Sequence, residues 1–260
     1  MTNDGFEALD WQGAPIECAS CPRAPLLAAG ACRRGHACVA DRYAKRIERF
    51  FHWNPDMANA YLGHPYFEVR AIAAKHADLF RLPALLRDPD ETVRWSAAQR
   101  LPERHLEQLV GDDHREVRVR VAQRLAPERL RRMMRDPDYY VRVIVARRLP
   151  LALLAPLRTD PERQVRLEVA RRLETPALLA MVADPDVAVR TVVAQRLPPA
   201  LLAPMLADDQ WQVRYEVAQR IDSRALAPLL ADEDQLVRDA AGQRWAGPGK
   251  SCATSLASTD

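Results

Sequence analysis

Four cysteines near the amino terminus have the residue type and spacing of a metal-binding site. Cys18, Cys21, Cys32 and Cys38 follow the pattern C-x2-C-x10-C-x5-C. Four thiolates complete either a structural zinc site or a cubane iron-sulfur cluster. Zinc sites more often use two close pairs, which Cys32 and Cys38 are too far apart to complete, but the compact ferredoxin run is also missing. The spacing therefore predicts a metal centre and leaves the two metals open.

Other side chains are weaker candidates for this site. His36 lies between two of the cysteines, and we expect it to support the ligands or face solvent, because four cysteines already complete a site. Three further histidines are alternative ligands: His52, His64 and His76. Cys252 stands apart in a Gly/Ser/Thr-rich tail, residues 247–260, which we expect to be disordered with a free thiol.

A repeat of fixed length fills the chain after this cysteine segment. The dipeptide Val-Arg occurs eight times at an interval of 24 residues, beginning at Val69-Arg70 and ending at Val237-Arg238. A fixed period means that each unit contacts its neighbours in the same way, so the body is a stacked array without a single central core. The cysteines thus belong to a head on a solenoid.

Each repeat carries signals for the start and the end of a helix. In the unit at residues 88–111, Asp88-Pro89-Asp90 predicts a start in which Asp88 caps the helix and Pro89 occupies its first position. Pro102 predicts its end after about eleven residues, a length set by the same pattern. Val93, Ala97 and Leu101 recur every four residues and form one apolar stripe, as packing requires.

The second half of each repeat is short and rich in leucine. About nine residues remain, with apolar pairs three apart such as Leu106 and Leu109, which suit one face of a short α- or 3₁₀-helix. An alanine column suggests close approach of neighbouring helices: Ala98, Ala122, Ala146, Ala170, Ala194 and Ala218. Strand alternation is absent from the repeat, so we predict an all-α solenoid.

Two arginine columns run through the array and allow two interpretations. One is the Arg of each Val-Arg pair, and the other recurs six positions later, from Arg100 to Arg244. In the structural interpretation, the guanidinium groups bind Asp residues and helix ends of adjacent repeats. In the alternative, they form a cationic stripe that binds nucleic acid or another acidic partner. We favour the structural interpretation, because acidic residues recur in the same units.

An amphipathic helix is predicted between the cysteines and the array. Residues 41–53 combine Tyr43, Ile47, Phe50 and Phe51 with a basic face that we expect to be solvated. The aromatic face is expected to cap the end of the solenoid. We therefore divide the chain into a metal-binding segment with its capping helix at 1–53, the solenoid at 54–246 and the tail at 247–260.

Composition narrows the remaining choices. The 38 basic and 35 acidic residues leave a net charge of +3, too small by itself to require nucleic acid. The amino terminus lacks the features of a signal peptide and no apolar run could span a bilayer, so a cytoplasmic protein without a membrane is expected. No phosphate loop, nucleophile elbow or metal-hydrolase histidine pair occurs, so we expect no enzyme.

The chain resembles the leucine-rich repeat variant proteins in both of its parts. The resemblance lies in the repeat D-P-D-x-x-V-R-x-x-V-A-x-R-L-P with its Leu-rich second half, and in the four-cysteine segment before it, and it covers nearly the whole chain. It implies alternating α- and 3₁₀-helices in a right-handed superhelix. It also implies a 4Fe-4S cluster on Cys18, Cys21, Cys32 and Cys38, with zinc as the alternative cofactor. The helical half is similar to HEAT-like repeats as well, but 24 residues leave little room for two full α-helices.

These observations lead to one functional expectation and its alternatives. We expect an iron-sulfur-containing repeat scaffold that binds another macromolecule, most simply a protein, with an electron-transfer or redox-sensing role. The alternatives are a nucleic-acid-binding solenoid that uses the Arg columns and a zinc-stabilised protein-interaction scaffold.

Overall fold

The computed structural model describes residues 8–245, and the regular elements of this part are helices. Pairing between extended segments is limited there to isolated bridges, such as Asp10 with Asp41, so the predicted all-α class is confirmed. None of the described helices is long and apolar enough to cross a membrane. The predicted tail and Cys252 lie outside the described residues.

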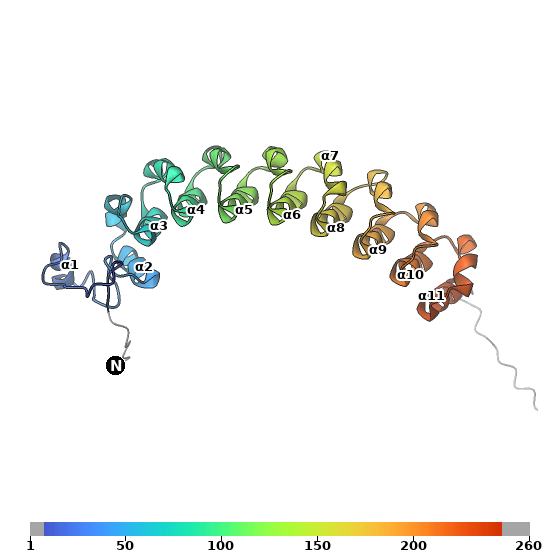
Figure 1. The fold of residues 1–260 in the computed structure, drawn as a ribbon, viewed down its shortest axis with the longest axis horizontal. Helices are drawn as coiled ribbons and strands as arrows, with labels where there is room; N and C mark the ends of the chain where they lie inside the picture. Colours follow the sequence, from blue (N-terminus) through green and yellow to red (C-terminus); the bar gives the residue numbers. More distant parts are fainter. Residues whose placement is uncertain (1–7, 246–260) are drawn as a thin grey trace, which may run out of the picture. The chain divides into compact units, whose positions relative to one another are not determined.

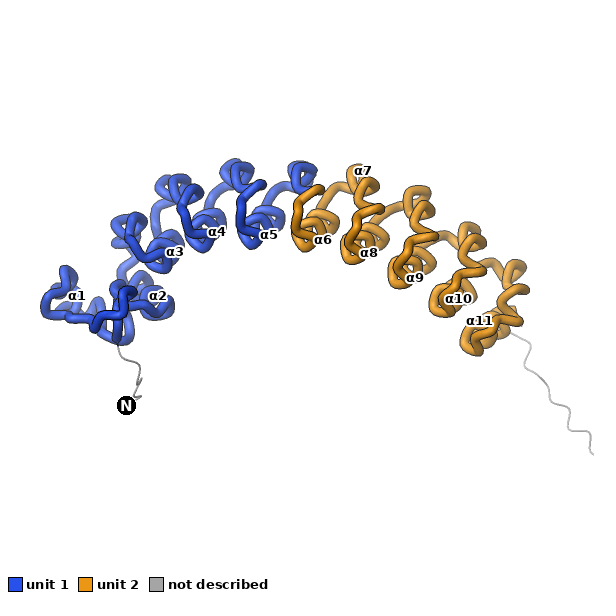
Figure 2. The backbone as a smooth tube through the Cα atoms, viewed as in Figure 1, with its two compact units in different colours: residues 1–133 blue, residues 134–260 orange. Residues whose placement is uncertain are grey.

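The first of two compact units ends at Met133 (Figure 2). Ten-residue α-helices alternate in it with 3₁₀-helices, here labelled η, in successive layers (Figure 1). Its helices are α1 (Ala24–Ala28), α2 (Ala44–Trp53), η1 (Pro55–Tyr61), α3 (Phe67–His76), η2 (Leu79–Arg87), α4 (Glu91–Arg100), η3 (Glu103–Leu109), α5 (Arg115–Arg124) and η4 (Pro127–Met133). The boundary predicted after residue 53 lies inside this unit and stays a prediction.

The second unit begins at Met134 and repeats the same alternation. Its helices are α6 (Tyr139–Arg148), α7 (Leu151–Leu154), η5 (Ala155–Thr159), α8 (Arg163–Arg172), η6 (Ala177–Met181), α9 (Val187–Arg196), η7 (Pro199–Leu201), η8 (Ala203–Met205), α10 (Trp211–Arg220), η9 (Ser223–Ala225), η10 (Ala227–Ala231) and α11 (Gln235–Trp245). In both units the predicted short helices are mostly 3₁₀, because nine residues between two fixed ends suit its longer rise per residue.

The predicted helix start is wrong by two residues. Helix α4 begins at Glu91, and its cap is Asp90, whose carboxylate accepts a hydrogen bond from the backbone N–H of Thr92. Asp88 instead accepts the N–H of Asp90 and two bonds from Arg70. Because the first aspartate bonds outside the helix, the second one caps it, and Pro89 precedes the cap.

The core of each unit consists of the predicted apolar positions. Val93, Ala97 and Leu101 of one repeat are buried together with Leu106 and Leu109 of its short helix. The predicted alanine column is also buried at every position from Ala98 to Ala218. Small side chains there allow the α-helices of neighbouring repeats to lie close together within each unit, as in the packing of α8 on α9.

Helix α2 covers the first repeat, as predicted, but is three residues shorter at its start. Ile47, Phe50 and Phe51 are fully or almost fully buried, and α2 packs against α3. Its basic face is not wholly solvated, because the buried Arg46 donates to Asp41 Oδ2 at 3.0 Å. Tyr43, predicted on the apolar face, is 39% exposed.

Candidate metal centre

The four predicted ligands lie around one pocket. Cys18, Cys21, Cys32 and Cys38 line it together, and the rest of its wall is largely apolar, including Ile16, Leu27 and Phe50. All four are free thiols; Cys38 is buried and the other three are half-buried. Short loops position them: Cys38 packs with Ala8 and Ile16 in a small core that Cys18 also contacts.

The electrostatics show that the thiols are close neighbours. Burial raises the pKa of Cys32, and the charges of Cys18 and Cys21 raise it further. Burial also raises the pKa of Cys38 to about 11, with backbone hydrogen bonds lowering it and the charges of Asp41 and Cys21 adding to the rise. Both thiols are therefore protonated at neutral pH without metal, and metal binding must release these protons.

The residues fit an iron-sulfur cluster. The four sulfurs surround an apolar pocket, and the backbone N–H of Arg23 donates to Cys21 Sγ at 3.4 Å. Hydrogen bonds to the sulfurs and a low-polarity wall are the means by which proteins adjust such clusters. Between residues 8 and 245, no three His, Cys, Asp or Glu side chains form a group that could hold a metal ion. The thiols thus line a pocket that is suited to a multi-atom group.

Arg23 and Tyr61 connect this pocket to the first repeat, and the sequence gave no signal for their pairing. Arg23 lines the pocket and its Nε donates to the Tyr61 hydroxyl at 2.7 Å, with the guanidinium carbon 5.3 Å from the ring centre. Asn54 Nδ2 adds a bond to the carbonyl of Ala31 at 2.8 Å. Two side chains 38 residues apart cannot be paired from a local pattern, so only the fold reveals this contact.

The histidines have other contacts. His36 Nδ1 lies 3.2 Å from Arg49 Nη1, and its ring lies against Trp53. His76 stacks on Phe51, where an Arg stands in the later repeats. His64 replaces the ladder aspartate: its Nδ1 accepts the N–H of Tyr66, as Asp88 accepts that of Asp90. Ligation by His52, His64 or His76 stays an untested alternative.

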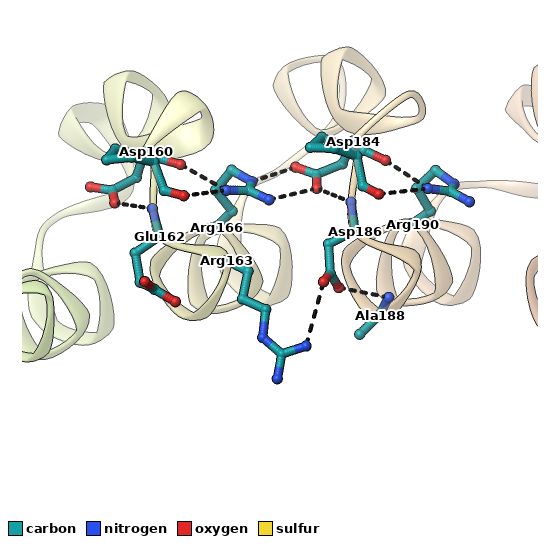
Figure 3. Close-up of polar contacts among 10 residues, drawn as sticks. Asp160, Glu162, Arg163, Arg166, Asp184, Asp186, Ala188 and Arg190 are labelled. Atoms are coloured by element: carbon teal, nitrogen blue, oxygen red, sulfur yellow. Dashed lines mark hydrogen bonds and ion pairs between the residues drawn. The ribbon is translucent and has the colours of Figure 1, made fainter.

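The first arginine column forms a ladder of ion pairs within each unit. Arg166 Nε and Nη2 donate to the two carboxylate oxygens of Asp184 at 2.8 and 3.1 Å, and its Nη1 donates to the carbonyl of Asp160 at 2.9 Å (Figure 3). Arg190 repeats this pattern on Asp208 and on the carbonyl of Asp184. Each aspartate therefore binds the arginine of the preceding repeat by its side chain and its own arginine by its backbone. The same carboxylate pairing occurs at Arg70–Asp88, Arg94–Asp112, Arg142–Asp160 and Arg214–Asp232.

The second arginine column binds helix ends. Arg196 Nη1 donates to the carbonyls of Ala170 and Leu173 in the preceding repeat, both at 2.7 Å. Bonds to the corresponding alanine carbonyl are made by Arg100, Arg124, Arg172, Arg220 and Arg244. These carbonyls lack partners inside their own helices, so cations there stabilise the helix ends. Both columns thus bind inside the array, which supports the structural interpretation over a cationic stripe.

Comparison with known proteins identifies the family. A solved structure described as a leucine-rich repeat variant with a novel repetitive structural motif superposes with a TM-score of 0.81; it is 41% identical, and the match covers 88% of this chain and 98% of that one. The chain belongs to the leucine-rich repeat variant family. This agrees with its 24-residue alternation of α- and 3₁₀-helices.

Two further matches concern parts of this leucine-rich repeat variant. The family model described as the LRV protein FeS4 cluster matches residues 8–60, which include all four cysteines. A Rhodobacter capsulatus protein described as an uncharacterized 27.7 kDa protein in the nifB 3′ region is 54% identical over 104 residues. That match spans 40% of this chain and 42% of the relative. The chain is therefore a repeat scaffold with an iron-sulfur family segment.

Proposed function

We propose that Cys18, Cys21, Cys32 and Cys38 bind a 4Fe-4S cluster that exchanges electrons with, or reports redox state to, a protein partner. One observation carries the proposal: four free thiols line one apolar pocket at the start of a repeat array. When bound, the cluster supplies one-electron chemistry. The residues of this chain hold it, limit access of water through the apolar wall, and place Arg23 beside it.

The array supplies the binding surface in this proposal. Its arginine columns are used inside the repeats, so the partner is recognised by side chains that differ between repeats on the α-helices, such as Trp95, Tyr139 and Trp211. Extended surfaces of this kind are typical of repeat proteins. We propose a non-enzymatic, cytoplasmic scaffold, in keeping with free thiols in a reducing compartment.

Anaerobic purification tests the cofactor. Protein prepared without oxygen should be brown and contain iron with acid-labile sulfide, and Cys18→Ser should release both. Stoichiometric zinc without sulfide would instead establish the zinc alternative. Pull-downs with the reduced, oxidised and cluster-free protein then test the role. Equal partner recovery in all three states, without measurable electron transfer, would leave the cluster with a purely structural role.

A further inference from the structure

The segment that carries three of the four cysteines buries none of its side chains completely. From Glu17 to His36 no residue is buried, although residues 24–31 are only Ala, Leu, Pro and Gly. Helix α1 likewise contains no buried residue. An apolar stretch of this length is normally packed against a core, and its exposure marks an interaction surface. We call the part formed by Pro25, Leu27, Ala28, Arg33 and Arg34 the cover surface; all five residues are exposed.

The cover surface lies directly over the cysteine pocket. Leu27 lines the pocket and is still 39% exposed, so one side chain contacts both the pocket and solvent. Arg34 lines the pocket as well and is exposed. Electron transfer slows steeply with distance, so a protein that docks here would approach the cluster as closely as the fold permits.

The charge on this surface is of one sign. Residues 18–40 contain three arginines and no Asp or Glu. Arg23 is directed to Tyr61, whereas Arg33 and Arg34 are exposed beside Cys32. Arg49 of α2 reaches the same loop through His36. An apolar centre with a cationic rim attracts an acidic partner and accelerates its association.

We propose that the cover surface is the docking site of a small acidic electron-carrier protein, which exchanges one electron with the cluster held beneath Leu27. The carrier loses one electron and the cluster gains it, or the reverse, and no bond forms or breaks. This inference rests on the proposed iron-sulfur function and adds the place of exchange and the charge class of the partner.

Anaerobic stopped-flow mixing tests the docking site with the full-length, cluster-loaded protein. The probe is an acidic flavodoxin in its hydroquinone state, and reduced methyl viologen serves as a small reductant that needs no docking. Arg33→Glu with Arg34→Glu should lower the second-order rate constant for flavodoxin at least about tenfold and remove most of its salt dependence. The viologen rate should fall much less. The matched control is Arg131→Glu with Arg132→Glu, an adjacent exposed pair on η4, which should leave the flavodoxin rate within about twofold of the parent.

Leu27→Ser and the single change Arg33→Glu keep the test decisive if the double variant loads iron poorly. Each should slow flavodoxin several-fold with an unchanged iron content. Equal rates in the cover-surface and η4 variants would overturn the docking site. So would slowing confined to vesicle binding or self-association, tested with anionic phosphatidylserine vesicles and by sedimentation. Absence of iron and sulfide in the parent protein would instead overturn the proposed function itself.

Discussion

Between Glu17 and His36 no residue is buried, whereas every repeat buries a stripe of valine, alanine and leucine. The cysteine segment is held to the first repeat by a few contacts, among them Arg23–Tyr61 and Asn54–Ala31. The repeats are held by burial and by a regular ion-pair ladder. The difference shows two sources of order, because a segment without its own core depends on its cofactor, while the array depends on interfaces between neighbours.

The largest expected effect is on the cysteine segment. Cys32→Ser should abolish cluster binding and make residues 17–36 sensitive to protease, because the cluster supplies most of the cross-links there. Helical circular dichroism of the array should change little. Iron content, limited proteolysis and circular dichroism measure the three effects. A protease-resistant segment in the cluster-free protein would contradict the comparison, and Cys252→Ser is the control that should keep the cluster.

Breaking one rung of the ladder should destabilise the array clearly. Asp232→Ala removes a partner that is 6% exposed and leaves the guanidinium of Arg214 without its buried carboxylate. We expect a loss of about 3 kcal/mol in the free energy of unfolding, the lower end for a broken buried pair. Glu233 binds the same arginine but is 82% exposed, so Glu233→Ala should cost below about 1 kcal/mol. Urea unfolding of the two variants measures the difference, and equal losses would count against the ladder.

Truncation of a core leucine should cost a similar or smaller amount and spread. Leu149 is fully buried, so Leu149→Ala should lower the free energy of unfolding by roughly 2–5 kcal/mol. Hydrogen exchange should accelerate in the adjacent repeats, because they share this interface. Leu151→Ala, at a side chain that is 42% exposed, is the matched control. Damage confined to one repeat would argue against stacked, interdependent units.

Acid should weaken the ladder. The hydrogen bond from Arg214 lowers the pKa of Asp232 despite its burial. The unfolded carboxyl, with a pKa of about 3.9, therefore takes up protons before the folded one. The stabilisation is complete above this pH and is lost as pH falls through the folded pKa. Urea unfolding from pH 5 to 2.5 should show a steeper decline in the parent than in Asp232→Ala, and parallel curves would contradict this.

The smallest effect is expected at the contact between the first repeat and the cysteine segment. Burial lowers the pKa of His64, and Arg70 nearby lowers it further against the hydrogen bond with Tyr66. The unfolded histidine, with a pKa of about 6.5, gains its proton first, so stability is complete above that pH and decreases as pH falls below it. His64→Asn keeps an acceptor for Tyr66 N–H and should flatten thermal stability between pH 7 and 5. An unchanged slope would exclude His64 as its cause.

The sequence by itself determined the repeat, the helical class, the buried columns and the identity of the four cysteines. These follow from periodicity and residue type, because a 24-residue unit must bury the same positions each time. Even the two uses of arginine were predictable in kind, since Asp and Arg recur in step.

Only the tertiary structure decided which partner each group takes. It assigned the helix cap to Asp90 instead of Asp88, because Asp88 is occupied by Arg70 from the preceding repeat. It also brought Arg23 to Tyr61 and left the apolar cover of the cysteines exposed. These contacts join residues far apart in the chain, and a donor's choice among several nearby acceptors depends on distances that no local pattern contains.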